Sequence, residues 1–141
     1  MTITWQLWAL LAAVFAALTA ILAKIGVADI NSNYATFLRT IVVVVALGLL
    51  VLGTGEIQSF ATISPRSLFF LSLSGLATGA SWLCYFKALQ LGQASQVAPV
   101  DKLSVVMVAI FGALFLGENL SLGGWAGVAM IAAGAIFVAI G

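Results

Sequence analysis

The sequence predicts an all-α integral membrane protein with five transmembrane helices, and two observations lead to this prediction. The chain has 141 residues, of which 64% are hydrophobic and 6% are charged, whereas a soluble domain carries about 25% charged residues because its surface faces water. The apolar residues also form continuous runs, each close to the roughly 20 residues that a helix needs to cross a bilayer. A β-barrel would show short alternating segments, so helices are the predicted spanning elements.

We expect the chain to form one domain. Short polar or glycine-containing segments separate its apolar runs, which predicts the following spans within residues 1–141: 3–24, 34–53, 66–89, 96–116 and 122–141. Tryptophan and tyrosine are typical of the membrane interface. They stand at or near the starts of three spans, as Trp5, Trp8, Tyr34 and Trp125.

The first two spans have recognisable ends. Residues 3–23 carry no charge, and Lys24 follows at a position from which its long side chain can reach the interface. Because no basic segment precedes this run and no cleavage site follows it, we interpret it as a mature span and not as a removed signal peptide. Asn31, Ser32 and Asn33 can act as caps for the second helix.

The last three helices also have recognisable starts. Ser64 before Pro65 fits an N-cap followed by proline at the first helical position. A short turn precedes the fourth helix, in which Pro99 disfavours helical geometry at Ala98 and removes one backbone hydrogen bond. The fourth helix is therefore predicted to start irregularly, and Ser121 is the predicted cap of the fifth.

The composition argues against several function classes. The chain has no His and a single Cys, Cys84, so the commonest general base is missing and no multi-thiolate metal site can form. We therefore expect no catalytic residue, no metal and no cofactor. A net charge of +1 gives no basic patch for nucleic acid, and the sequence has no phosphate-binding loop for ATP-driven pumping.

Charged residues inside spans are costly, and they are the first candidates for function. Arg39 lies about one and a half turns into the second predicted span, roughly 8 Å from its start at 1.5 Å per residue. It is either a substrate contact or an anchor whose side chain reaches back to the interface. The sequence gives these two interpretations about equal weight.

Asp101 and Lys102 are stronger candidates for a functional site than Arg39, because two charges fall in one span next to Pro99. Neighbours on a helix point about 100° apart, so we expect the two not to pair face to face. Interrupted helices form substrate sites in secondary transporters, since freed carbonyls and a helix end become available there. We therefore favour substrate or coupling-ion binding over the alternative, in which Asp101 only stabilises a helix start at the interface.

The third span carries an aromatic face at helical spacing, formed by Trp82, Tyr85, Phe86 and Leu89. Trp82 and Tyr85 are candidate substrate contacts, because aromatic rings can hold an apolar or cationic compound. Helix packing is the simpler interpretation of the same stripe, and it is the one that we favour. Lys87 beside this face is interpreted as an interface anchor.

Small residues predict close helix contacts. Gly75 and Gly79 are four residues apart in the third span, and the fifth span carries glycines at related intervals. Glycine lets helix backbones approach closely. Gly123, Gly127 and Gly134 are therefore predicted to form a helix-packing or dimerisation face, and the sequence leaves open which of the two it is.

The basic residues favour one orientation in the membrane. Arg66 lies on the N-terminal side, whereas Lys24 and Lys87 lie at span ends on the other side, with Arg39 and Lys102 in nearby turns of helix. Basic residues are enriched in the cytoplasm, so the sequence favours an outside N-terminus and an inside C-terminus. The difference is only one to three charges, and insertion in both orientations stays open.

The third to fifth spans contain a recognisable series of motifs. The run Tyr85-Phe-Lys-Ala-Leu-Gln-Leu-Gly92 leads into Ala94-Ser-Gln-Val-Ala-Pro99, and Leu116-Gly-Glu118 follows with the spacing of Gly127 and Gly134. Together these motifs resemble the EamA-type domain of the drug/metabolite transporter superfamily. The similarity covers nearly the whole chain, including an arginine early in the second span, and its specific part is the Ala-Ser-x-Val-Ala-Pro to Leu-Gly-Glu stretch.

This resemblance implies one five-helix repeat, which is one half of a drug/metabolite-transporter-like fold. The usual members of the family have ten helices in two repeats of opposite orientation, so a complete path would need a second copy. The resemblance therefore implies an oligomer, most simply a homodimer, and an antiparallel homodimer would reproduce the inverted repeat. A parallel dimer, or a pair with another half-transporter, is the fallback.

The implied function is secondary transport of a small organic solute by alternating access, in the plasma or inner membrane of a prokaryote. The implied partners are the lipid bilayer, the solute and a second copy of the chain. The alternative is a non-transporting membrane subunit that packs against a partner protein through its glycine faces. We expect no enzyme activity, because the usual acid–base and metal constellations are missing. The substrate, its charge, the coupling ion and the direction of transport are left open by the sequence.

Overall fold

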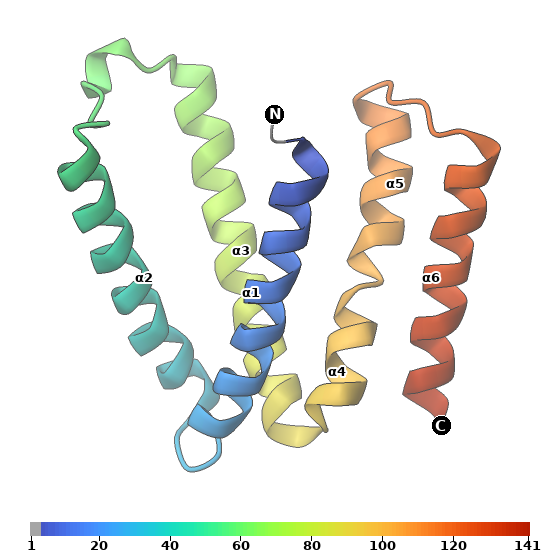
Figure 1. Ribbon diagram of the computed structural model, residues 1–141. Coiled ribbons are helices and arrows are strands. Elements are labelled where there is room, and N and C mark those ends of the chain that lie inside the picture. Colours follow the sequence, from blue (N-terminus) through green and yellow to red (C-terminus); the bar gives the residue numbers. More distant parts are fainter. Residues whose placement is uncertain (1–3) are drawn as a thin grey trace. The chain divides into compact units, whose positions relative to one another are not determined.

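The computed structural model describes residues 4–141, and the regular elements within that range are helices (Figure 1). They are α1 (Trp5–Gly26), α2 (Ser32–Thr54), the short η1 (Phe60–Thr62), α3 (Pro65–Leu91), α4 (Ala94–Asp101), α5 (Ser104–Phe115) and α6 (Leu122–Ile140). Five segments are long and apolar enough to cross a membrane, with α4 and α5 together forming the fourth. The predicted fold class is confirmed. The predicted start of the first span, at residue 3, lies outside the described residues.

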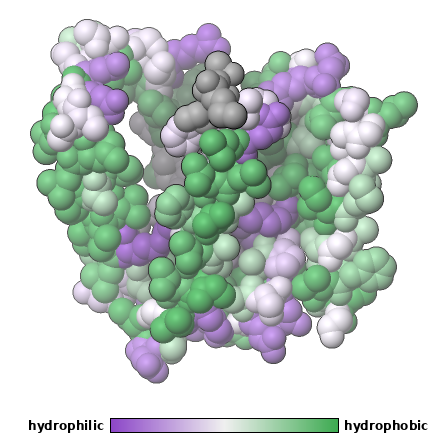
Figure 2. Space-filling model, in the orientation of Figure 1, coloured by the Kyte–Doolittle hydropathy of each residue, from purple (hydrophilic) through white to green (hydrophobic). Residues whose placement is uncertain are grey.

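Apolar side chains cover the surface of the single chain instead of filling its interior. Among the described residues, the buried hydrophobic ones are Ala20, Val27, Phe86, Leu89 and Ala135. Figure 2 shows apolar residues over most of the surface of α2. A soluble monomer rarely exposes large apolar patches, whereas lipid accepts them, so this surface fits a protein that is embedded in a bilayer.

Three predicted helix caps are present, which explains why the helices begin where they do. A side-chain oxygen before the helix accepts a hydrogen bond from a backbone amide of its first turn, which would otherwise have no partner. Asn31 accepts from the amides of Asn33 and Tyr34, Ser64 accepts from the amide of Ser67, and Ser121 accepts from the amide of Gly124, at 3.0–3.3 Å.

Two helices end at glycines with left-handed backbone angles. Gly55 after α2 has a φ of 71°, and Gly117 just beyond α5 has a φ of 68°. A side chain would be strained at either position. These glycines therefore fix the points at which the chain leaves α2 and α5.

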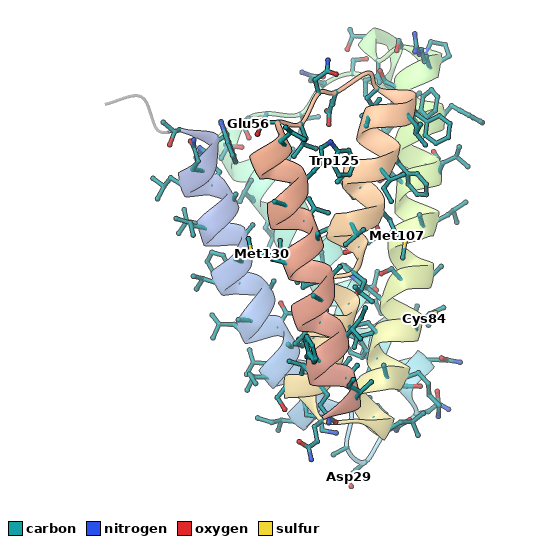
Figure 3. The ribbon with its side chains drawn as sticks, turned by 90° about the vertical axis from the view of Figure 1, so that its right-hand side faces the viewer. Asp29, Glu56, Cys84, Met107, Trp125 and Met130 are labelled. Atoms are coloured by element: carbon teal, nitrogen blue, oxygen red, sulfur yellow. The ribbon has the colours of Figure 1, made fainter. Side chains whose placement is uncertain are left out.

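The chain forms two compact units. Unit 1 comprises Leu91–Gly141 with most of α1, and unit 2 comprises Ala23–Gln90. In unit 1, α6 packs against α4 and α5. In unit 2, α2 and α3 run in opposite directions and are joined through η1 (Figure 1). Asp29 and Glu56 mark the two opposite ends of this unit in Figure 3.

Hydrogen bonds between distant segments close one end of unit 2, which we call the α1–α3 corner (Lys24, Val27, Leu89 and Gln90). Nζ of Lys24 donates to the carbonyl of Leu89 at 2.6 Å, where a cation complements the negative end of α3. Nε2 of Gln90 donates to the carbonyls of Val27 at 3.3 Å and Ile30 at 3.0 Å. Val27 and Leu89 are fully buried. The corner therefore fixes the end of α3 against the turn that leads into α2.

Candidate functional site

Arg39 of α2 is held against two aromatic rings of α3. Its guanidinium carbon lies 4.0 Å from the centroid of the Trp82 ring and 5.6 Å from the centroid of the Phe86 ring. A cation–π contact at such distances contributes about 0.5–2 kcal/mol, with the larger values in desolvated surroundings. The structure thus brings together two predicted site residues, Arg39 and Trp82, and adds Phe86, a member of the same aromatic face that was not among the predicted contacts.

The guanidinium of Arg39 has one nitrogen that is shielded from water and lacks an acceptor. Within residues 4–141, Nη1 is buried and no hydrogen-bond partner reaches it, although the residue as a whole is half-buried. In the same range the structure shows no carboxylate within 4.0 Å of Arg39; the ion pair that it does show joins Asp101 to Lys102. Arg39 is therefore a partly desolvated cation without a counter-ion in the described chain.

The start of α2 around Arg39 is polar but packed. Ser32 and Thr36 are buried, and the hydroxyls of Thr36 and Thr40 donate to the carbonyls of Ser32 and Thr36 at 2.9 and 2.8 Å. Such bonds to the preceding turn satisfy the hydroxyl protons within the helix. The first two turns of α2 can therefore pack inside unit 2 without partners from elsewhere.

The four residues of the aromatic face of α3 differ in how deeply they are buried. Phe86 and Leu89 are buried, while Trp82 and Tyr85 are half-buried. The cation that lies over Trp82 is the chain's own Arg39, so that ring face is already occupied. Lys87 is exposed and its Nζ lies 3.4 Å from Oε1 of Gln90.

Unit 1 contains the second candidate cluster, at the break between α4 and α5 (Figure 1). The predicted loss of helical geometry at Ala98 is wrong, because α4 runs through Pro99 as far as Asp101. Proline removes only its own N–H, so the bonds on either side of it hold the helix together. The helix opens one turn later, at Lys102, whose ψ of −4° departs from the helical value of about −42°.

The backbone tightens where the two helices meet. Three bonds of the 3₁₀ type follow the end of α4, and they run from the amides of Leu103, Val105 and Val106 to the carbonyls three residues earlier, at 2.9–3.0 Å. Short 3₁₀ stretches inside a helix often mark hinges. The fourth span is thus an interrupted helix, and its interruption directly follows the charged pair.

Asp101 and Lys102 contact each other, which corrects the prediction that they would not pair. Nζ of Lys102 lies 3.4 Å from Oδ2 of Asp101. The prediction assumed a continuous helix, whereas α4 ends at Asp101 and the backbone turns at Lys102. The side chains are 53% exposed for Lys102 and 35% for Asp101. The pair is therefore within reach of a ligand or of water.

The predicted glycine faces lie open in the single chain. Among the described residues, a Cβ added at Gly75, Gly79, Gly127 or Gly134 would meet no other atom within 4 Å, and one added at Gly123 would meet only Oγ of Ser121, at 3.8 Å. These faces are therefore available to lipid or to another chain.

One close contact in unit 1 was not anticipated from the sequence. An ideal Cβ on the buried Gly112 would lie 2.6 Å from Oε2 of Glu118, and the amides of Leu116 and Glu118 both bond to the carbonyl of Gly112, at 3.1 and 3.0 Å. The Leu-Gly-Glu motif thus folds back onto the last turn of α5. A glycine in an otherwise bulky apolar run was the one signal for this contact.

Ionised residues and a broken helix inside the spans of a multi-pass chain are typical of membrane transporters. The model of the EamA-like transporter family matches residues 3–140. The chain is also 60% identical, over 140 residues and 99% of both proteins, to a Sinorhizobium sp protein described as an uncharacterized transporter in the cobO 3'region. This chain belongs to the EamA-like transporter family, as its motifs implied, and is a multi-pass membrane protein with a transporter role. No solved structure matches it.

Proposed function

We propose that the chain is a secondary transporter that moves a small organic solute by alternating access, without enzyme activity of its own. The observation that carries this proposal is the interrupted fourth span, in which a helix break exposes an ionised pair inside an otherwise apolar segment. Interrupted helices bind solutes and coupling ions in secondary transporters, because their ends and free side chains face the binding site.

Each charged candidate has a distinct role in this proposal. Asp101 binds the coupling proton or a cationic group, and Lys102 or Arg39 binds an anionic group. Trp82 and Tyr85 contact the solute through their aromatic rings. Pro99 disfavours a continuous helix in the fourth span. Because Asp101 and Lys102 neutralise each other at 3.4 Å, a proton on Asp101 would release Lys102, and this couples the two charges.

We propose a homodimer as the transport unit. Residues 4–141 of one chain supply five spans, and two copies related by an axis in the membrane plane would supply the inverted repeat of many transporters. The Sinorhizobium relative has about the same length, and the glycine faces of α3 and α6 are open to a second chain. In this arrangement α6 mainly packs or dimerises.

Transport is tested in proteoliposomes with a proton gradient. Labelled small organic cations, anions and zwitterions are offered, and we expect the protein to take up at least one of them faster than empty liposomes do. Asp101→Asn is expected to lower that uptake at least tenfold while the crosslinked dimer persists. The matched control is Asp29→Asn, an exposed carboxylate in the turn before α2 (Figure 3), which should leave uptake unchanged.

The same experiment separates transport from the alternative of a non-transporting subunit. That alternative expects no uptake of any solute and expects Asp101→Asn to be silent, while Gly127→Leu abolishes the partner complex. Orientation is tested with tags at both termini in intact cells and with cysteines in α6, in a Cys84→Ala background because Cys84 is exposed. If every copy shows one orientation, the dimer is not antiparallel.

A further inference from the structure

We propose that Arg39 receives the oxyanion of the transported solute, so that the solute is an organic anion with a carboxylate or phosphate beside an apolar body. This inference rests on the proposed transport function and deepens it. It decides between the anionic and cationic solutes that the mixed charge of the spans had left open. The residues that would form the site all belong to unit 2.

The depth of the guanidinium argues against a simple interface anchor. The start of α2 and the end of α3 lie at the same end of unit 2, since Gln90 bonds to Ile30. Arg39 lies roughly 10 Å into α2 from that end, and Trp82 lies roughly 14 Å into α3, at 1.5 Å per residue. The guanidinium lies closer to Trp82 than to the shallower Phe86. The side chain therefore extends toward the middle of the span, whereas an anchor would extend toward the interface.

Within residues 4–141 the charge of Arg39 shows no anionic partner, and each of the four acidic side chains has another contact or is exposed. Asp101 pairs with Lys102, and Glu118 lies over Gly112. Asp29 is exposed in the turn before α2. Glu56 accepts a bond from Thr54 at the far end of α2, seventeen residues or roughly 25 Å along from Arg39. A cation inside a span without a counter-ion is costly, so an anionic ligand would stabilise it.

A flat contact of the guanidinium with the Trp82 ring would leave its donating edge for a ligand. An arginine that is stacked on a ring keeps its N–H groups in the plane of the guanidinium, pointing away from the stack, and this planar fork matches two oxygens of a carboxylate or phosphate. Nη1 lacks an acceptor within the described residues although it is shielded from water, and a ligand would reach the guanidinium through the accessible remainder of this half-buried side chain. The half-buried part of Trp82 that Arg39 does not cover would then lie beside the apolar part of the solute, which favours an aromatic or aliphatic anion over a small hydrophilic one.

The phosphate of a lipid headgroup offers the same oxyanion chemistry as a solute, and the experiment separates the two sources. Purified protein in dodecyl maltoside, which contains no phosphate, is titrated with labelled benzoate, octanoate or phenyl phosphate at constant chloride. Benzamide, octanamide and phenol are the uncharged analogues. In a parallel arm, dihexanoyl phosphatidylglycerol is the ligand.

We expect at least one of the three solute anions to bind at least tenfold more tightly than its uncharged analogue. Arg39→Gln is expected to lower that affinity at least tenfold, and Arg39→Lys to lower it by less, because the charge remains while the fork is lost. The matched control is Arg66→Gln. Arg66 is the other arginine and lies in the first turn of α3, and its guanidinium carbon also lies near an aromatic ring, 6.0 Å from the centroid of Phe70. This control should stay within twofold of the wild type.

Three outcomes overturn the inference. The first is a wild type that binds all three anions no better than their analogues, and this measurement does not depend on the folding of any variant. The second is an Arg39→Gln or Arg39→Lys protein that elutes as a single species and binds the anion as the wild type does. The third is Arg39-dependent binding of phosphatidylglycerol alone, which would make Arg39 a lipid contact.

The failure of this inference and the failure of the transport proposal give different results. Uptake of a cation without Arg39-dependent anion binding overturns the anion site and leaves transport in place. Arg39-dependent anion binding without uptake of any solute overturns transport and leaves the anion site in place.

Discussion

Each of the two units of this transporter has its own kind of internal contact, and the two kinds differ. In unit 2, side chains donate to carbonyls 60 or more residues away, from Lys24 to Leu89 and from Gln90 to Val27 and Ile30. In the described part of unit 1, the ion pair that the structure shows joins two neighbours, Asp101 and Lys102, and α6, a helix of apolar residues and glycines, packs against α4 and α5. Directional bonds fix one unit, and non-directional packing holds the other.

This difference indicates which unit is fixed and which can move. A hydrogen bond weakens steeply when its geometry changes, whereas smooth apolar faces lose little energy when they slide. The helix break at Lys102 also lies in unit 1. We therefore expect the movements of transport to concentrate in α4–α6, while unit 2 holds Arg39 in one place.

Loss of Gln90 is expected to have the largest effect on stability. Gln90→Leu removes two hydrogen bonds and leaves the carbonyls of Val27 and Ile30 without these donors, which should lower the stability by about 2–3 kcal/mol. Thermal unfolding in detergent measures the change. Gln58→Leu, at an exposed position, is the control and should unfold like the wild type. Equal unfolding temperatures for the two variants would contradict a polar anchor at the α1–α3 corner.

Loss of Lys24 is expected to have a smaller effect at the same corner. Lys24→Met removes one charge-assisted bond to the carbonyl of Leu89, worth about 1.5–2 kcal/mol. The same unfolding assay applies, with Lys87→Met as the control because Lys87 is exposed and its contact to Gln90 is long, at 3.4 Å. If the Lys87 variant is the less stable one, the bond from Lys24 to Leu89 does not stabilise the α1–α3 corner.

Pro99→Ala is expected to act in the opposite direction, in unit 1. Alanine restores an amide donor and favours a continuous helix, so stability should rise by about 1 kcal/mol. If the break serves movement, uptake of the solute in proteoliposomes should fall despite the higher unfolding temperature. A variant that is both more stable and equally active would show that the break is not needed for transport.

Lys102→Gln is expected to change stability least, by less than about 0.5 kcal/mol, because exposed ion pairs contribute little. Its effect on uptake should nevertheless be clear, since Asp101 would lose its partner. A large drop in unfolding temperature with unchanged uptake would assign the pair to structure instead of function.

The local features of this fold were predictable from the sequence. The helix caps at Asn31, Ser64 and Ser121 depend on residues two or three positions apart, so the sequence contains all the information that they need. The apolar runs likewise predict spans because bilayer thickness sets their length.

The contacts between distant segments were not predictable in the same way. Arg39 and Trp82 were both candidates, but their pairing depends on the register of α2 against α3, which no local pattern encodes. The pair of Asp101 and Lys102 was misjudged because it depends on where α4 ends, which is beyond Pro99 and not at the residue that precedes it. The bond from Lys24 to Leu89 was missed for the same reason as the pairing of Arg39.

The unequal lengths of the helices make the bilayer itself a part of the structure. The 19 residues of α6 extend about 28 Å and the 27 residues of α3 about 40 Å, against a hydrocarbon core of about 30 Å. A thicker membrane would therefore leave α6 too short, whereas α3 already has to tilt or project beyond the core. With so few side chains buried within a single chain, the acyl-chain length of the surrounding lipid is expected to influence how α6 packs.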